Sequence, residues 1–132
     1  MAVNDRFALA LTHFEKSLAR LKEALAQNED EFIRDSIIQR FEFTFETAWK
    51  AMYRWLRARV NDVDEEAFAV IPMAFERRLI ADAKAWGDMR KARNKTSHTY
   101  DQNIAIEVAA FARHGSIALF DDLLETLHER AE

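Results

Sequence analysis

The segment from Arg93 to Asp101 carries the densest group of chemically useful side chains in this sequence. Arg93 is a permanent cation with a fork of N–H donors, and His98 is the side-chain type whose ordinary pKa lies nearest to neutrality. The same segment adds neutral hydrogen-bonding groups and a phenol: Asn94, Thr96, Ser97, Thr99 and Tyr100. A titratable imidazole beside fixed positive charge suits a ligand that carries phosphate.

The charge next to this segment is opposite in sign to that of the whole chain. The chain of 132 residues has a net charge of −4, whereas residues 84–95 contain five basic residues and one acidic residue, a local charge of +4. The basic residues are Lys84, Arg90, Lys91, Arg93 and Lys95. We therefore expect a local basic site, and not a surface that binds nucleic acid everywhere.

Composition predicts a single helical domain that spans residues 1–132. With 49% hydrophobic residues the chain can bury a substantial core. Only two glycines and one proline are present, and helix-forming residues dominate. The absence of cysteine excludes disulfides, thiolate metal sites and thiol catalysis. No signal peptide or membrane span is expected, which favours a soluble protein of the cytoplasm.

Apolar spacing predicts where the helices lie. A stripe at intervals of three and four from Phe7 to Leu25 indicates a first helix with a cap at Asn4 or Asp5. A second helix is expected over residues 29–59, a short one over residues 72–81 that begins at Pro72, and a fourth over residues 83–97 capped by Asp82. Asp101 should cap the last helix. Residues 64–70 are expected to form a loop or turn.

The second helix is apolar on more than one face, because Ile38, Phe43 and Trp55 fall outside its main stripe. Such a helix needs a second partner, from its own bundle or from another subunit. Its polar residues Glu42, Glu46 and Lys50 are interpreted as a solvated face. Together the helices predict an all-α fold, an antiparallel up-and-down four-helix bundle with a short extra helix.

The central segment also has a purely structural interpretation. Arg93 and His98 are five residues apart, about 140° around an ideal helix, and so do not share a face unless the helix loosens. In the structural interpretation, Arg93 pairs with an acidic residue, His98 caps a carbonyl at the end of the helix, and Tyr100 is half-buried. The other histidines lie singly on separate helices without the spacing of metal ligands, so we expect no metal site and no cofactor. They are His13, His114 and His128.

Two segments together resemble a known family. The run from Arg40 to Lys50, followed by the run from Arg93 to Asp101, resembles the nucleotidyltransferase substrate-binding family, the HepT-like branch of the HEPN superfamily. The resemblance covers nearly the whole chain. It implies a small helical bundle that forms a homodimer and is encoded near a minimal nucleotidyltransferase. It also implies that Arg93 and His98 are catalytic in a metal-independent endoribonuclease, a class in which some members are toxins, and that Asn94 is the polar neighbour in the motif.

The resemblance further implies that Tyr100 is a tyrosine to which the partner enzyme can add AMP. Arg90 and Lys91 precede the motif and strengthen the attraction to RNA, so Arg90, Asn94 and Lys95 are expected to bind the substrate. Two functions stay open at this point. The chain could be a ribonuclease toxin, or it could be a non-catalytic subunit that presents a substrate or nucleotide to the nucleotidyltransferase. A third possibility is a helical adaptor that only dimerises.

Overall fold

The computed structural model describes residues 3–131, with side chains from Asp5 onward, and every regular element in that range is helical. This confirms the all-α bundle with a short extra helix. The elements, in chain order, are α1 (Val3–Leu25), α2 (Glu31–Arg57), α3 (Ala67–Glu76), α4 (Ala83–Asn94), the 3₁₀ turn η1 (Lys95–His98), α5 (Gln102–Phe111), the π-helical turn η2 (Ala112–Ser116) and α6 (Ile117–Arg130).

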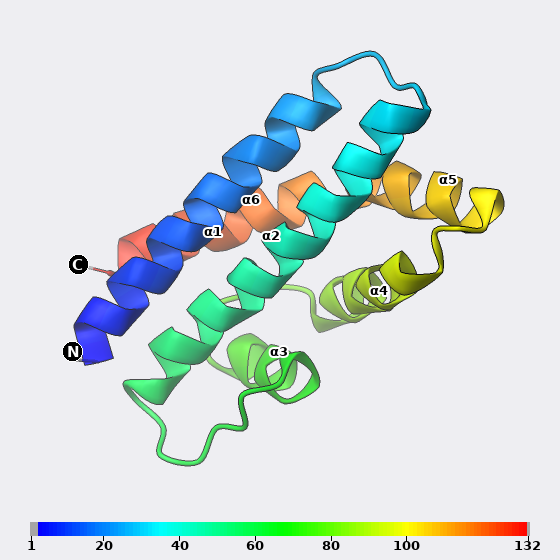
Figure 1. Ribbon diagram of the computed structural model, residues 1–132. Helices are drawn as coiled ribbons and strands as arrows, with labels where there is room; N and C mark the ends of the chain where they lie inside the picture. The colour runs from blue at the N-terminus through cyan, green and yellow to red at the C-terminus, as the bar shows by residue number, and fades with distance from the viewer. Residues whose placement is uncertain (1–2, 132) are drawn as a thin grey trace.

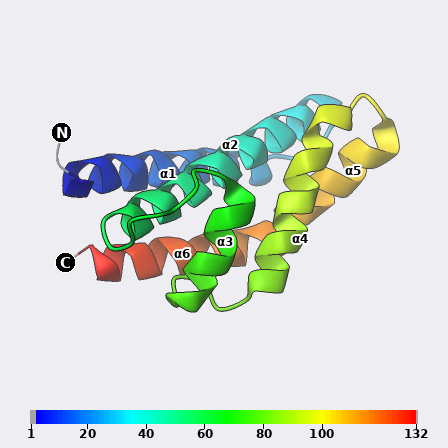
Figure 2. The same cartoon turned by 90° about the horizontal axis from the view of Figure 1, so that it is seen from below.

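The two longest helices, α1 and α2, run antiparallel along the molecule, and α6 packs beneath them (Figure 1). The shorter helices α3 and α4 lie across this layer, and both termini lie at the same end (Figure 2). The turn that joins α4 to α5 lies at the opposite end (Figure 1). This places the segment of residues 93–101 far from the termini, at an exposed corner.

Large side chains from α1, α2, α4 and α6 build the core. Phe14, Phe41 and Phe120 are completely buried, and the rings of Phe14 and Trp86 each meet the Phe120 ring edge-on, with centroids 6.0 and 5.9 Å apart. Edge-on aromatic pairs add to the stabilisation that burial provides. The core therefore links α4, which carries the candidate motif, to the long helices, and Trp86 on α4 faces inward.

The helix starts agree only in part with the sequence-based prediction. Asp82 and Asp101 cap α4 and α5 as expected, with side chains that accept hydrogen bonds from Ala85 N and from Asn103 N and Ile104 N. A cap at Asn4 or Asp5 is wrong, because α1 already begins at Val3. The second helix begins at Glu31, capped by Asp30, and is slightly shorter than predicted.

The prediction for the short helix is wrong in position. Helix α3 covers Ala67–Glu76, so the residues expected to form a loop are mostly helical and Pro72 lies inside the helix. Proline in a helix interior costs one hydrogen bond and clashes with the preceding turn. Here Pro72 is exposed, whereas Val70, Ile71 and Ala74 are buried. Burial of that apolar face outweighs the cost of the proline.

The two glycines have different surroundings. A Cβ on Gly87 would meet nothing within 4 Å, so this glycine is not required by the close approach of a neighbouring segment. A Cβ on Gly115 would lie 3.2 Å from the Phe111 ring. Gly115 belongs to the π-helical turn that separates α5 from α6, and its lack of a side chain lets the Phe111 ring pack there.

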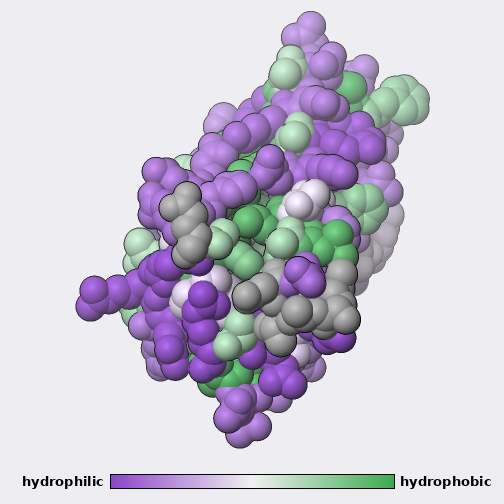
Figure 3. All heavy atoms as spheres, turned by 90° about the vertical axis from the view of Figure 1, so that its left-hand side faces the viewer, coloured by the Kyte–Doolittle hydropathy of each residue, from purple (hydrophilic) through white to green (hydrophobic). Residues whose placement is uncertain are grey.

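The surface carries scattered apolar side chains among its charges. Figure 3 shows hydrophobic surface in the middle of one face, with hydrophilic residues around it. Several large apolar side chains are at least 46% exposed, among them Phe32, Phe43 and Tyr100. In the described part of the chain, no helix has the length and apolar character required to cross a membrane.

Candidate functional site

The motif segment is held by hydrogen bonds at the carboxyl end of α4. There Thr96 Oγ1 lies 2.7 Å from Arg93 O, Ser97 Oγ 3.2 Å from Asn94 O, and Thr99 Oγ1 3.2 Å from Thr96 O. The last carbonyls of a helix lack backbone partners, and these hydroxyl groups donate to them. The neutral polar residues of the segment therefore shape the turn, and the side chains beside them are left for other contacts.

Arg93 is fixed by an acidic residue of α2. Its Nε donates to Glu46 Oε1 across 2.6 Å, and Glu46 Oε2 accepts from Trp49 Nε1 at 2.9 Å. The Arg93 and Glu46 side chains are only 29% and 30% exposed, so solvent screens their ion pair partly. The Nη groups of Arg93 form no hydrogen bond with a described residue. Glu46 thus orients the guanidinium while leaving two amino groups for a ligand.

Glu42, one helical turn before Glu46, faces the same segment. One of its carboxylate oxygens lies within hydrogen-bond distance of Thr96 Oγ1, which is itself only 9% exposed. Thr96 has one hydroxyl proton, so it donates either to Glu42 or to Arg93 O at any moment. The interpretation of Glu42 and Glu46 as a solvated face is wrong, because both contact the motif segment. Lys50, in contrast, is exposed.

A signal for these two carboxylates was present in the sequence. Glu42 and Glu46 are four residues apart and therefore on one side of α2. They interrupt a helix whose neighbouring residues Phe41 and Phe45 are completely or almost completely buried. Acidic residues in so apolar a helix need partners, and the Arg93 segment supplies them.

His98 and Tyr100 project into solvent. His98 Nδ1 lies 3.4 Å from the Tyr100 hydroxyl, at the long limit for a hydrogen bond, and the two rings meet edge-on with centroids 6.0 Å apart. Tyr100 is 86% exposed. The structural interpretation in which Tyr100 is half-buried and His98 caps a carbonyl is therefore wrong, although the expected pairing of Arg93 with an acidic residue is confirmed.

Arg93 and His98 are not joined within one chain. No hydrogen bond between them is found among residues 3–131, and Arg93 is half-buried against α2 whereas His98 is exposed. A 3₁₀ helix advances about 120° per residue instead of about 100°, so η1 carries His98 further round from Arg93. A ligand that touches both side chains must wrap the turn, or a second molecule must complete the site.

The three other predicted site residues lie around this corner with different partners. The Arg90 guanidinium lies over the Phe68 ring of α3, 5.6 Å from its centroid. Lys95 forms an ion pair with Glu107 of α5 at 2.6 Å, and both side chains are about half exposed. Asn94 is exposed and its side chain forms no hydrogen bond with a described residue. Of the three, Asn94 is the most available to a ligand.

A shallow hollow of about 410 Å³ lies beside the segment, between α2 and the turn. Its lining includes Glu42, Thr96 and Tyr100, together with Asp35 and Gln39 of α2. Two carboxylates on this side make it a poor place for phosphate. Phosphate is better accommodated where the Nη groups of Arg93 and the side chain of Asn94 are available.

Nothing in the described residues suggests a metal centre. No group of three His, Asp or Glu side chains between residues 5 and 131 is arranged to hold a metal ion. His13 and His114 are exposed, and His128 Nε2 lies 2.9 Å from Glu15 Oε2 at the surface.

Comparison with known proteins identifies the family. Residues 9–129 match the family model described as "Nucleotidyltransferase substrate binding protein like". The match spans both the α2 segment that carries Glu42 and Glu46 and the segment from Arg93 to Asp101. The chain belongs to this family. The resemblance inferred from those two segments is therefore confirmed.

Two solved structures share the fold. One, a protein of Thermus thermophilus, is 34% identical, with a TM-score of 0.72, and the alignment covers 90% of this chain and 98% of that one. The other, from Haemophilus influenzae, is described as the fold of a substrate binding domain of a nucleotidyltransferase. It is 26% identical, with a TM-score of 0.68, over 95% of this chain and 98% of that one.

One relative is named as an enzyme. A protein of Haemophilus influenzae named "Probable ribonuclease HepT" is 40% identical over 77 residues, which are 55% of this chain and 53% of the relative. The chain thus matches about half the length of that relative.

Proposed function

We propose that this protein is a HEPN-type endoribonuclease that cleaves RNA without a metal ion, with Arg93 and His98 as catalytic residues. The observation that carries the proposal is the way Arg93 is held. Glu46 binds only its Nε, so a rigidly placed guanidinium keeps both Nη groups for a phosphate. The similarity to a probable ribonuclease supports the same assignment.

The reaction needs one group to remove a proton and another to stabilise negative charge. His98 takes the proton from the 2′-hydroxyl of RNA, the freed 2′-oxygen attacks the adjacent phosphorus, and the bond from phosphorus to the 5′-oxygen breaks. The Nη groups of Arg93 stabilise the extra charge on the phosphoryl oxygens. The products are a 2′,3′-cyclic phosphate and a 5′-hydroxyl, and the leaving oxygen must gain a proton.

A second protomer can supply that proton. A single imidazole that has just accepted a proton on one side of the phosphate is badly placed to donate it on the other side. We therefore place the active site at a homodimer interface, where two copies of the Arg93–His98 segment face each other. The separation of Arg93 and His98 in one chain, and the exposure of His98, both fit a site completed by a partner.

Family membership also bears on the biological setting. We infer that a minimal nucleotidyltransferase encoded nearby acts as the antitoxin of this ribonuclease toxin. Membership of the family, and similarity to a structure described as a substrate binding domain of a nucleotidyltransferase, support such a partner. They also favour a second function, in which the chain is a non-catalytic subunit that presents a substrate or nucleotide to that enzyme, with Arg93 and His98 binding phosphate.

Expression without the partner separates the two functions. The wild-type chain, His98→Ala and Arg93→Ala are induced in a host that lacks the nucleotidyltransferase, and total RNA is examined for new ends. If the chain is a ribonuclease, the wild type produces RNA fragments with 2′,3′-cyclic phosphate ends, and the purified protein keeps this activity in EDTA. Both variants lose the activity, while their circular dichroism spectra stay the same as that of the wild type.

Arg93→Lys should restore only part of the activity, because lysine lacks the planar fork. His13→Ala and His128→Ala, which remove histidines far from the segment, serve as matched controls and should cleave like the wild type. Intact RNA with the wild-type chain would favour the binding subunit, and cleavage that persists in His98→Ala would contradict the mechanism.

A further inference from the structure

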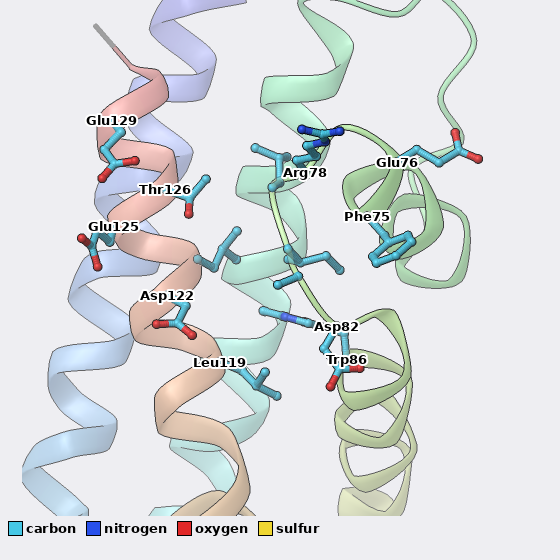
Figure 4. A pocket seen from close by; sticks show the side chains of 14 residues that line it. Phe75, Glu76, Arg78, Asp82, Trp86, Leu119, Asp122, Glu125, Thr126 and Glu129 are labelled. Carbon is cyan, nitrogen blue, oxygen red and sulfur yellow. The ribbon is translucent and has the colours of Figure 1, made fainter.

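A hollow lies away from the motif segment, between α6 and the segment that joins α3 to α4. It measures about 950 Å³. Its walls come from the end of α3 and the following loop on one side and from α6 on the other, with the α4 residue Trp86 at one end (Figure 4). We refer to this hollow as the α6 groove.

The floor of the α6 groove is apolar. Leu79, Ile80, Trp86 and Leu123 line it and are almost fully buried in the core, while Phe75 is 47% exposed at one edge. Leu119 adds a half-buried aliphatic side chain on α6. The four buried side chains expose almost no area, so a partner that covers the groove gains free energy mainly by burying Phe75 and Leu119.

The rim of the α6 groove is acidic. Five carboxylates lie around it and only one cation, Arg78, so its charge is close to −4; the carboxylates are Glu76, Asp82, Asp122, Glu125 and Glu129. None of the five forms an ion pair with a described residue. Two acidic residues near the motif segment differ from these five, because Glu46 and Glu107 each form an ion pair with a cation.

The shape of the groove is maintained by α6. Arg130, near the end of that helix, donates from Nη1 to Arg77 O at 3.2 Å and from Nη2 to Arg78 O at 3.0 Å. These bonds hold the loop after α3 against α6. The groove is therefore built into the fold, and a partner would not have to open it.

We propose that the α6 groove binds a basic amphipathic helix of another protein. Along α6 the carboxylates of Asp122, Glu125 and Glu129 are spaced three and four apart, which draws one acidic stripe about two turns long. A partner helix of the same length could lay an apolar stripe on the floor and place lysines and arginines against both rims. Negative charge on the rim repels RNA, so this surface is separate from the proposed RNA site.

The probe is a labelled synthetic peptide of about 15 residues, helical by design, with leucines on one face and lysines and arginines beside them. Binding to the full chain is followed by fluorescence anisotropy, and its location by amide chemical shifts. We expect shifts at residues 75–82 and 119–129. Asp122→Lys/Glu125→Lys/Glu129→Lys should weaken binding at least about tenfold, and Arg78→Gly, which removes the only cation, should strengthen it.

The matched control removes the same charge elsewhere. Asp5, Asp62 and Asp64 are exposed and form no ion pair with a described residue, so Asp5→Lys/Asp62→Lys/Asp64→Lys should bind the peptide nearly as well as the wild type. Equal losses in both triple variants would mean general attraction to an acidic protein and would overturn the proposal. Chemical shifts outside the groove would overturn it too.

Two further measurements exclude other occupants. If the groove triple variant changes the oligomeric state in analytical ultracentrifugation, the occupant is a second copy of this chain and the proposal fails. If a single-stranded RNA oligonucleotide shifts the same amides, the surface binds nucleic acid and the proposal also fails. Circular dichroism confirms that each variant is folded.

Discussion

At the scale of single residues, the site depends on how Glu46 holds Arg93. A guanidinium is useful to a phosphate only where its fork is oriented, and an arginine side chain on its own samples many rotamers. The contact at Nε removes this freedom, and Trp49 in turn fixes the carboxylate. Glu46 is therefore a positioning residue for the proposed reaction.

Glu46→Gln tests this role. The amide keeps the size of the side chain but loses its charge, so we expect kcat of RNA cleavage to fall at least about tenfold while KM changes less. The melting temperature should change little, because the ion pair is partly exposed to solvent. Asp121→Asn, which breaks the surface pair with Lys22, is the control and should leave the activity unchanged. Wild-type kcat in Glu46→Gln would show that Arg93 needs no positioning.

Tyr100 is placed where an enzyme can reach it. Its side chain is 86% exposed and its hydroxyl lies only 3.4 Å from the imidazole of His98. AMP on that hydroxyl would set a bulky anion beside His98, and it would block RNA mainly by occupying space, because exposed charges are screened within about 8 Å.

Incubation with the partner nucleotidyltransferase and ATP should therefore add the mass of AMP and suppress cleavage. Tyr100→Phe should stay active, within about tenfold of wild type given the long contact to His98, and should resist suppression. Mass spectrometry locates the adduct, with Tyr53→Phe as the control, since Tyr53 is buried. An adduct elsewhere, or a silenced Tyr100→Phe protein, would refute this account.

At the scale of helices, ion pairs in the turns fix how neighbouring elements meet. Glu29, between α1 and α2, accepts a hydrogen bond from Arg34 Nε at 3.0 Å and one from Arg113 Nη2 at 3.1 Å. Arg113 belongs to the π-helical turn η2 and also donates to Leu25 O at 2.9 Å. These contacts join the connection between α1 and α2 to the π-helical turn between α5 and α6.

The pKa of Glu29 predicts a pH dependence. Burial raises this pKa, but the hydrogen bonds from Arg34 and Arg113 outweigh burial and leave it below its usual value of 4.5. A carboxyl with a lowered pKa in the folded state stabilises the fold above the unfolded-state pKa, and this stabilisation is lost as the pH falls through the folded-state pKa.

Glu29→Gln should therefore be less stable than the wild type near neutral pH, and the two should converge below the pKa of Glu29 in the folded protein. Urea unfolding at about pH 7 and about pH 3 measures the difference. Asp62→Asn, at an exposed position without an ion pair, is the control. A difference in stability that is the same at both pH values would contradict the proposed linkage.

At the scale of the whole molecule, opposite charges are collected in different places. The carboxyl end of α4 is basic, while the α6 groove next to the start of α4 is acidic. RNA and a basic protein segment would thus be attracted to different parts of one small bundle. The exposed apolar side chains Phe32 and Phe43 on α2 leave a further surface for a second copy.

We predict a homodimer in which both copies of His98 act on one phosphate. Light scattering should give twice the mass of the chain at micromolar concentration, and a monomer would contradict the prediction. Dimers with one wild-type and one His98→Ala protomer, isolated with two affinity tags, should lose nearly all activity. Dimers that pair wild type with His13→Ala are the control. Retention of half the activity would mean that each protomer works alone.

The sequence alone determined the helical class and the caps at Asp82 and Asp101. These depend on local rules, since apolar periodicity and short polar side chains before a helix act within a few residues. The same rules placed α3 wrongly, because a local preference against proline inside a helix was outweighed by burial of Val70, Ile71 and Ala74.

Only the tertiary structure decided which side chains meet. Glu46 and Arg93 are 47 residues apart in the chain, and their contact exists because α4 packs across α2. The assembled bundle also buries Ile38 and Trp55, two of the residues that had suggested a second partner for α2, and leaves Phe43 exposed. The α6 groove likewise draws on residues from 75 to 129. Contacts over such separations depend on how whole helices pack, which periodicity within one helix does not specify.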